Sequence, residues 1–555
     1  MPPKREDILS RKLEKKGKSK VPQSEIDFLQ AADDFEKSAG KWRAGDIEKA
    51  TRFFQRAIDM LDAGLQRYPK SFDLAYNKAT LEYTLLTNRR ILALLGDKNT
   101  LLEASLASHR TAISLNPSNT DILFNTGQVL TSISEVLLEN SNQETAKPQA
   151  RACLEEALDI FTKCLDNQQS EYEQMQAEIA KANASQEHQE FQDVDQEMST
   201  EALEQDSMEV SSNSSESPGE WATVVEPVTP EAILDTCIAK LSTLTSLLIL
   251  YDGTNQQTME LKIHDGISIA NDKMLPLITL IGASLFSGPT EEPAPGPTLS
   301  IASPSTIEDP GTSLTTDALL TIANFRSAVA EFNYRNHHFD ASKYAAEVEQ
   351  IFANLIKTPP NPTQFDPDFT AAMSAYADAL TDLASAIADL EAYTPSSPTF
   401  LSDLEVQWSA LSRTQTVLSQ ISIKSDSGIR SSSRLAGIYA ARGDTDLFRF
   451  RISLFAEAKP AWADSKLVLV ANAGVYYRGA GKHAVMAGED DVQKTVDAKA
   501  TVAEILKEAA SGEVVSQDKW KGNREELVRV LEDMVEEGIV ERENAEGVLR
   551  HTRLN

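Results

Sequence analysis

Two short runs of residues carry side chains that could bind phosphate or a metal ion. Gly479-Ala480-Gly481-Lys482 resembles part of a phosphate-binding loop, but the first glycine of that motif is missing at the required spacing. His483 stands where a serine or threonine would hold magnesium, so we expect an ordinary loop. His337 and His338 are adjacent and point in different directions on any regular element, without a cysteine or acidic partner at ligand spacing. We expect a turn between two helices there.

The other chemistry-bearing residues do not form a catalytic pattern. Cys153, Cys164 and Cys237 form no CxxC pair and lie in helical apolar patterns, which favours buried small side chains in a reducing compartment. The chain contains no HExxH, no G-x-S-x-G and no glycine-rich nucleotide-binding pattern after a strand. We therefore predict a protein that is not an enzyme and has no cofactor or metal site. An enzyme with an unrecognised site is an alternative.

The charge of the chain is strongly negative. Its 555 residues include 84 Asp and Glu against 53 Lys and Arg, which gives a net charge of −31. This balance argues against binding nucleic acid or an anionic membrane, because both need clustered basic residues, and it favours a basic protein partner. The longest apolar runs, Leu244 to Tyr251 and Met274 to Phe286, are too short to span a bilayer. The N-terminus is polar and basic, so we expect a cytoplasmic or nuclear protein.

Most of the chain shows the residue spacing of helices that pack in pairs. Ala50, Phe54 and Ala57 lie on one helical face after a Gly-Asp turn, and the stretch 150–157 repeats their spacing. No strand–turn–strand pattern is recognisable. The sequence therefore predicts an all-α fold.

These patterns resemble the tetratricopeptide-repeat (TPR) superfamily, in which paired helices cross at small side chains and a proline ends the second helix. The resemblance places these small residues at helix crossings: Ala57, Ala79, Ser105, Ala112, Gly127, Ala150 and Ala157. The repeats are irregular, and His109 replaces a large apolar residue of the family pattern. The resemblance implies an α-solenoid of TPR-like hairpins, whose long inner surface binds other proteins.

The same resemblance identifies a candidate protein-binding groove. In TPR proteins that grip acidic peptide C-termini, an asparagine on the first helix of a repeat acts beside a lysine one turn earlier. Here Asn77 and Asn125 stand at the asparagine position, but Asp73 and Asp121 replace the lysines. The reversed charge would repel a carboxylate and attract a segment that carries Lys or Arg. The alternative for both aspartates is structural, because negative charge stabilises a helix N-terminus.

An acidic segment interrupts the helical pattern. No Lys or Arg occurs between Lys181 and Lys240, and the composition of residues 185–220 is typical of disorder. Such a segment could shield a basic client as a tethered polyanion, and the alternative is a solvated linker. The candidate client-shielding residues are Glu197, Glu201, Glu204 and Asp206. Order resumes at Thr229, the expected N-cap of a helix that begins with Pro230.

The chain divides into alternating ordered and irregular segments. We expect loops around Asn88–Thr100, and we expect the last hairpin of the C-terminal repeats to turn at Gly443-Asp444. The expected segments are a basic disordered tail (1–24), N-terminal TPR-like repeats (25–181), an acidic disordered insert (182–226), helical repeats (227–287), a Pro/Gly/Ser-rich linker (288–313), C-terminal TPR-like repeats (314–480) and a C-terminal helical region (481–555). The basic tail is either solvated or a nuclear-import signal.

These features together predict a non-catalytic TPR-type scaffold or chaperone for a basic client. A disordered acidic insert in such an array resembles histone chaperones of the interrupted-repeat type, and acidic chaperones of ribosomal proteins use the same physics. A histone or a ribosomal protein is therefore the expected kind of client. The alternative is a neutral structural adaptor within a multiprotein complex, whose binding would respond little to salt.

Overall fold

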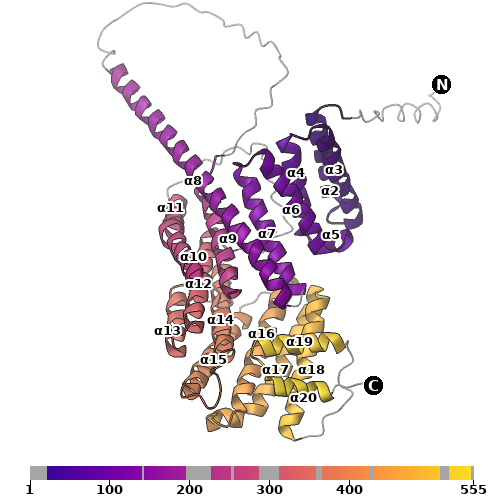
Figure 1. Cartoon of the computed structure of the whole chain (residues 1–555), viewed down its shortest axis with the longest axis vertical. Helices are drawn as coiled ribbons and strands as arrows, with labels where there is room; N and C mark the ends of the chain where they lie inside the picture. The colour runs from indigo at the N-terminus through magenta and orange to yellow at the C-terminus, as the bar shows by residue number, and fades with distance from the viewer. Residues whose placement is uncertain are drawn as a thin grey trace, which may run out of the picture. The chain divides into compact units, whose positions relative to one another are not determined.

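The computed structural model describes residues 22–140, 143–194, 227–251, 256–286, 312–357, 366–423, 429–512 and 524–551. Every regular element in these ranges is a helix, which confirms the predicted all-α architecture of successive helical pairs (Figure 1). The chain forms two compact units, Met1–Leu250 and Tyr251–Asn555. The boundary between them falls inside the expected segment 227–287.

The first unit is a run of antiparallel helices. α2 packs on α3, α4 on α6, and α7 on α8, while α9 packs against α8. The helices are α2 (Glu25–Trp42), α3 (Ile47–Arg67), α4 (Phe72–Leu86), α5 (Arg89–Leu95), α6 (Lys98–Leu115), α7 (Thr120–Asn140), α8 (Gln143–Val194) and α9 (Pro230–Ile249). The first helices of the successive pairs, α2, α4, α7 and α9, also contact one another in that order.

Small side chains at the helix crossings allow this close packing. The residues expected at these points are all buried: Ala57, Ala79, Ser105, Ala112, Gly127, Ala150 and Ala157. A Cβ atom on Gly127 would lie 2.4 Å from Cζ of Phe161, whose ring is fully buried. No larger residue fits there unless the ring moves, so the glycine is fixed by packing rather than by a turn.

Polar side chains determine where the helices of the first unit begin. The side chains of Ser24, Asp46 and Ser71 each accept a hydrogen bond from the backbone N–H three residues later. Thr229 does the same for α9, and Pro230 occupies its first position. The predicted N-terminus of α9 is therefore confirmed.

The second unit continues the pattern of helical pairs. α12 packs on α13, α14 on α15, and α16 on α17, which in turn packs on α18. The helices are α10 (Gln256–Ser268), the π-helix η1 (Ile269–Met274), α11 (Leu275–Phe286), α12 (Leu314–Arg335), α13 (Ala341–Phe352), α14 (Pro367–Ala388), α15 (Phe400–Ile423), α16 (Ile429–Ser453), α17 (Pro460–Ala487), α18 (Asp490–Ser511), α19 (Arg524–Glu536) and α20 (Arg542–His551). His337 and His338 lie in the turn between α12 and α13, as predicted.

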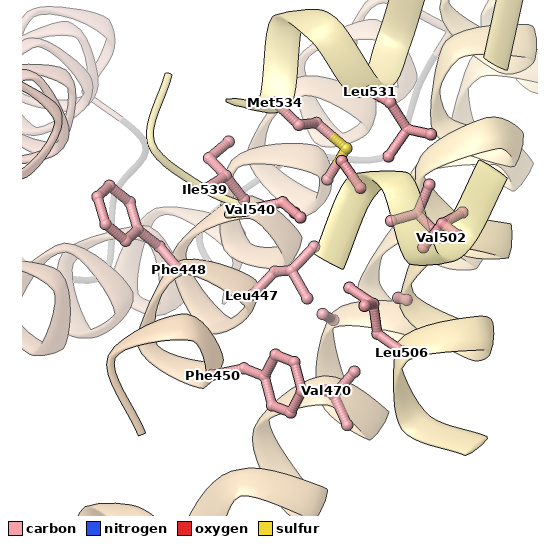
Figure 2. Packing of buried hydrophobic residues seen from close by; sticks show 14 of the residues in the cluster. Leu447, Phe448, Phe450, Val470, Val502, Leu506, Leu531, Met534, Ile539 and Val540 are labelled. Carbon is pink, nitrogen blue, oxygen red and sulfur yellow. The ribbon is translucent and has the colours of Figure 1, made fainter. Parts of the chain in front are cut away.

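The C-terminal helices close over a large apolar core (Figure 2). Leu447 of α16 and Val502 of α18 lie near Met534 of α19, and Val540 follows from the connection to α20. These side chains are at most 3% exposed, so α19 and α20 are integral to the second unit.

Three segments expected as loops are helical instead. Gly443-Asp444 lies inside α16, where a Cβ on Gly443 would be 2.5 Å from Cε1 of Tyr477. That glycine therefore serves close packing, and the predicted turn is wrong. Gly479–Lys482 lies inside α17. Most of Asn88–Thr100 forms α5 and the start of α6.

The acidic insert begins later than predicted. α8 runs to Val194, so residues 185–194 are helical where disorder was expected. Glutamine and glutamate make up half of this stretch and have high helix propensity, which apolar content alone does not reveal. Glu197, Glu201, Glu204 and Asp206 lie outside the described residues.

One helix among the described residues, α9, is long and apolar enough to cross a membrane by length and composition. In the structure 61% of its most apolar window is buried. Leu234, Leu241 and Leu247 are almost completely covered, and α9 packs against α8. These contacts are those of a core helix in a helical array.

Candidate protein-binding surface

The four predicted groove residues lie on two neighbouring first helices of the first unit. Asp73 and Asn77 are exposed on α4, while Asp121 is exposed and Asn125 is half-buried on α7. Each aspartate is the second residue after the N-cap, and each asparagine follows one turn later. The N-caps are Ser71 and Asn119, whose side chain accepts a hydrogen bond from the Ile122 N–H at 2.9 Å.

Contacts between α4 and α7 show that the same faces of the two helices meet. The hydroxyl oxygens of Tyr83 and Ser132 are 3.3 Å apart, two to three turns beyond the aspartates. Burial raises the pKa of the Tyr76 phenol, and the charge of Asp121 raises it further. Asp121 therefore faces α4 closely enough to act on its side chains.

The helix α9 continues the arrangement with residues that the sequence comparison missed. Glu231 is the second residue after the N-cap Thr229, and Asp235 follows one turn later, so they correspond to Asp121 and Asn125. Both are exposed. The sequence could have identified both residues, because the predicted N-cap Thr229 fixes the positions of Glu231 and Asp235 in α9. We call the six side chains the acidic ladder: Asp73, Asn77, Asp121, Asn125, Glu231 and Asp235.

Electrostatic interactions at the start of α4 favour binding of a cation. Partial burial raises the pKa of Asp73, and the nearby charge of Glu25 raises it further. Glu25 itself accepts a hydrogen bond from the Ser71 hydroxyl at 2.5 Å. A positive group placed there would relieve the repulsion between the two carboxylates.

Asn77 has a structural role as well. Its side-chain amide donates to the Asp73 carbonyl oxygen at 2.7 Å, which fixes the orientation of the amide and directs its own oxygen away from the helix backbone. The aspartates also lie in the first turns of their helices, where negative charge is favourable. The structural and binding roles are compatible.

Few basic residues occur near the beginnings of these helices. Lys78 of α4 lies 2.6 Å from Asp62 Oδ1 and 3.7 Å from Glu82 Oε1, so two carboxylates already compete for its charge. The sequence of α7 contains no Lys or Arg, and the first two turns of α9 also contain none. Acidic residues therefore outnumber basic residues in the first turns of α4, α7 and α9.

A buried histidine of α6 packs against a tyrosine of α4. His109 of α6 is fully buried. Its Nδ1 lies 2.8 Å from the Ser105 carbonyl oxygen, and Tyr83 packs against the ring edge-on at 6.2 Å. Burial lowers the pKa of this imidazole. Its Nε2 has no hydrogen-bond partner among the described residues.

The second unit holds a separate group of carboxylates. Asp378 and Asp382 are exposed on α14, one turn apart. Loss of hydration raises the pKa of Asp382 to about 7, and the charges of Glu331, Asp378 and Glu537 add to the effect. Asp382 therefore lies near several other carboxylates, although its side chain is exposed. Sequence patterns gave no sign of this group, because its members come from three distant segments.

Among the described residues, the fold does not bring the other candidate histidines and cysteines together in a metal site or a disulfide. Within the described ranges no three His, Cys, Asp or Glu side chains are arranged to hold a metal ion. His483, inside α17, stacks on Tyr439 with ring centroids 5.4 Å apart. None of the three cysteines, all of which are described, forms a disulfide. Burial raises the pKa of the Cys164 thiol to about 12, which makes it a poor nucleophile at neutral pH.

Comparisons with known proteins give distant similarities. No protein-family model matches the chain. The "UPF0656 protein C926.02" of Schizosaccharomyces pombe is 29% identical over 167 residues, which is 30% of this chain and 36% of that protein. The chain therefore spans about a third of the length of this relative. A solved circular tandem repeat protein aligns with 95% of this chain and 99% of its own, at 11% identity and a TM-score of 0.28.

Proposed function

We propose that the chain is a non-catalytic, TPR-type scaffold or chaperone that binds a basic protein client, such as a histone or a ribosomal protein. The observation that carries this proposal is the acidic ladder. Three successive first helices present a carboxylate at the second residue after the N-cap and a carboxylate or amide one turn later. A repeated row of this kind suits a chain with repeated cations rather than a small molecule.

The spacing of the ladder suggests what the client segment looks like. Adjacent packed helices lie about 8–10 Å apart. An extended peptide advances about 3.3–3.6 Å per residue, so every third residue meets the next helix. A segment with Lys or Arg at about every third position would therefore place one cation opposite the ladder residues of each helix. The amides of Asn77 and Asn125 can accept or donate hydrogen bonds to its backbone.

The test is a salt titration of binding to purified core histones and, separately, to purified basic ribosomal proteins. The changed protein carries Asp73→Asn, Asp121→Asn and Asp235→Asn. The matched control carries Asp59→Asn and Glu155→Gln, which neutralise exposed carboxylates on the second helices α3 and α8. Three lost charge pairs should weaken binding on the order of tenfold at low salt, and the difference should shrink as salt rises.

The result also separates this proposal from a neutral adaptor. Affinity that hardly changes between low and high salt, or equal loss in the ladder variant and its control, would contradict a charge-based groove. A further variant that lacks residues 196–220 measures the contribution of the acidic insert, including Glu197, Glu201, Glu204 and Asp206. We expect this deletion to lower affinity further while the helical content of the two units is kept.

The proposal fits a cytoplasmic or nuclear protein. The absence of disulfides among Cys153, Cys164 and Cys237 is compatible with a reducing compartment. Histones and ribosomal proteins are both made in the cytoplasm, where they can bind polyanions non-specifically. An acidic surface that binds them first would prevent this binding.

A further inference from the structure

The outer face of α17, in the second unit, exposes an unusual number of large apolar side chains. Five of the sixteen exposed large hydrophobic residues in the described ranges belong to this helix. Val468, Val475 and Met486 are 61%, 58% and 62% exposed, and Val485 is 56% exposed. Leu467 is 39% exposed. Single exposed hydrophobic residues are ordinary, whereas a group on one helix indicates an interaction surface.

These side chains share one arc of the helix surface, with Arg478 and Lys482 between Val475 and Val485. At 100° per residue, Val468, Val475 and Met486 fall in one column along the helix, and Leu467 and Val485 fall in the column beside it. The stripe runs from residue 467 to residue 486, about 28 Å along the axis at 1.5 Å per residue. We call these five residues the α17 stripe.

The stripe is not needed for the core of the second unit. The opposite side of α17 carries Val470, Ala473 and Tyr477, which are almost completely buried against α16 and α18. The neighbouring outer helix α15 shows the usual alternative, because its exposed positions include Ser402, Glu405 and Ser409. Of the exposed large apolar residues in the described ranges, α15 carries one, Leu401, and α17 carries five.

The charges on the same face are mainly positive. Arg478 and Lys482 are exposed between the apolar residues, and no carboxylate of the described residues lies within ion-pair distance of either. Asp464, near the beginning of the helix, is the acidic side chain on this face. In a chain with 84 acidic and 53 basic residues, two cations without an ion pair on an apolar face are a specific feature.

We infer that the α17 stripe is a docking surface for an acidic amphipathic helix of another protein. Apolar residues at both ends of a face about five turns long can contact the apolar face of a second helix. Carboxylates beside that face would pair with Arg478 and Lys482. A second copy of α17 is disfavoured, because antiparallel pairing would bring the same cations together. This surface would not bind the basic client of the acidic ladder, and the inference does not depend on that proposal.

The test uses two designed, stapled helical peptides that share one leucine stripe. Glutamates flank the stripe in one peptide and lysines flank it in the other. Binding is followed by fluorescence anisotropy with the full chain. We expect the acidic peptide to bind at least tenfold more tightly than the basic one. The double change Arg478→Glu and Lys482→Glu should invert this preference, whereas the control Lys507→Glu and Arg524→Glu should leave it unchanged.

A second variant tests the apolar contribution. Val468→Ser, Val475→Ser and Met486→Ser should reduce binding of the acidic peptide at least tenfold while thermal unfolding stays the same, because these side chains are exposed. No saturable binding up to roughly 100 µM, or equal affinity for both peptides, would overturn the inference. Self-association or flotation with phosphatidylserine vesicles that the serine variant abolishes would also overturn it, in favour of a second copy or a membrane.

Discussion

At the scale of single residues, the ladder shows how one position can serve both stability and recognition. Asp73 lies in the first turn of α4, where it favours the helix, and Asn77 holds its amide on the Asp73 carbonyl at 2.7 Å. Neither role occupies the outward-facing side-chain oxygen atoms of Asp73 and Asn77. A substitution such as Asp73→Asn therefore removes charge while keeping shape, which makes it a sensitive probe of client binding.

His109 gives the clearest residue-scale prediction. Burial lowers the pKa of this histidine, so the folded state holds it neutral while the unfolded chain gains a proton below pH 6.5. Its contribution to stability is complete above pH 6.5 and is lost as the pH falls, by at most about 1.4 kcal/mol per pH unit. Thermal unfolding of His109→Leu at pH 5.5 and 7.5 should show a smaller pH effect than the unchanged protein.

An exposed histidine provides the control for this measurement. His264→Gln should keep the pH dependence of the unchanged protein, because His264 is exposed on α10. If His109→Leu and the unchanged protein lose stability in parallel between pH 7.5 and 5.5, then His109 is not the group whose protonation matters.

At the scale of elements, one polar network joins three helices of the second unit. Asp444 of α16 accepts hydrogen bonds from the Tyr477 hydroxyl of α17 and from Lys499 Nζ of α18, both at 2.8 Å. The side chains of Asp444 and Lys499 are 18% and 13% exposed. Burial alone would lower the pKa of Lys499, but the charges of Asp444 and Glu537 raise it, so the ammonium form is held.

Removing one partner of this network should destabilise the second unit. Lys499→Met leaves the Asp444 carboxylate mostly buried without its cation, at an expected cost of about 3–5 kcal/mol in the free energy of unfolding. The double change Lys499→Met and Asp444→Asn should recover part of that loss, because no charge then remains unpaired. Chemical denaturation of the single and double variants measures both effects, and equal stability of the two would exclude the pairing.

At the scale of the whole molecule, each of the two units contains apolar clusters of its own. The apolar clusters of the first unit draw their buried residues from α2 to α8, while those of the second draw theirs from α12 to α20. Each cluster is assembled within one unit. This separation matches the opposite charge of the two surfaces described above, one acidic and one basic.

The first unit should therefore fold by itself. A fragment of residues 22–250 is expected to unfold cooperatively with a helical circular dichroism spectrum and to bind histones with the same salt dependence as the full chain. The fragment 251–555, which lacks the ladder, is the comparison. A helical 22–250 fragment without client binding would show that the ladder is insufficient, and an unstructured one would show that the cores depend on each other.

The sequence by itself determined the class of fold and the N-cap Thr229, because these depend on local spacing along one helix. The family resemblance indicated the small residues that the structure buries. It also located Asp73, Asn77, Asp121 and Asn125 on helix faces. Glycine was less informative: Gly443 suggested a turn, but it lies inside α16 because the Tyr477 ring from another helix occupies the space of a Cβ.

Only the tertiary structure decided which residues meet across helices. Loss of hydration raises the pKa of Asp382, and carboxylates on α12, on α14 and just after α19 raise it further, although no local pattern connects those segments. The α17 stripe is likewise invisible in a sequence, because an apolar residue predicts burial until the neighbours that could cover it are known. Long-range packing decides burial and electrostatic surroundings, and these in turn decide which surfaces remain available to partners.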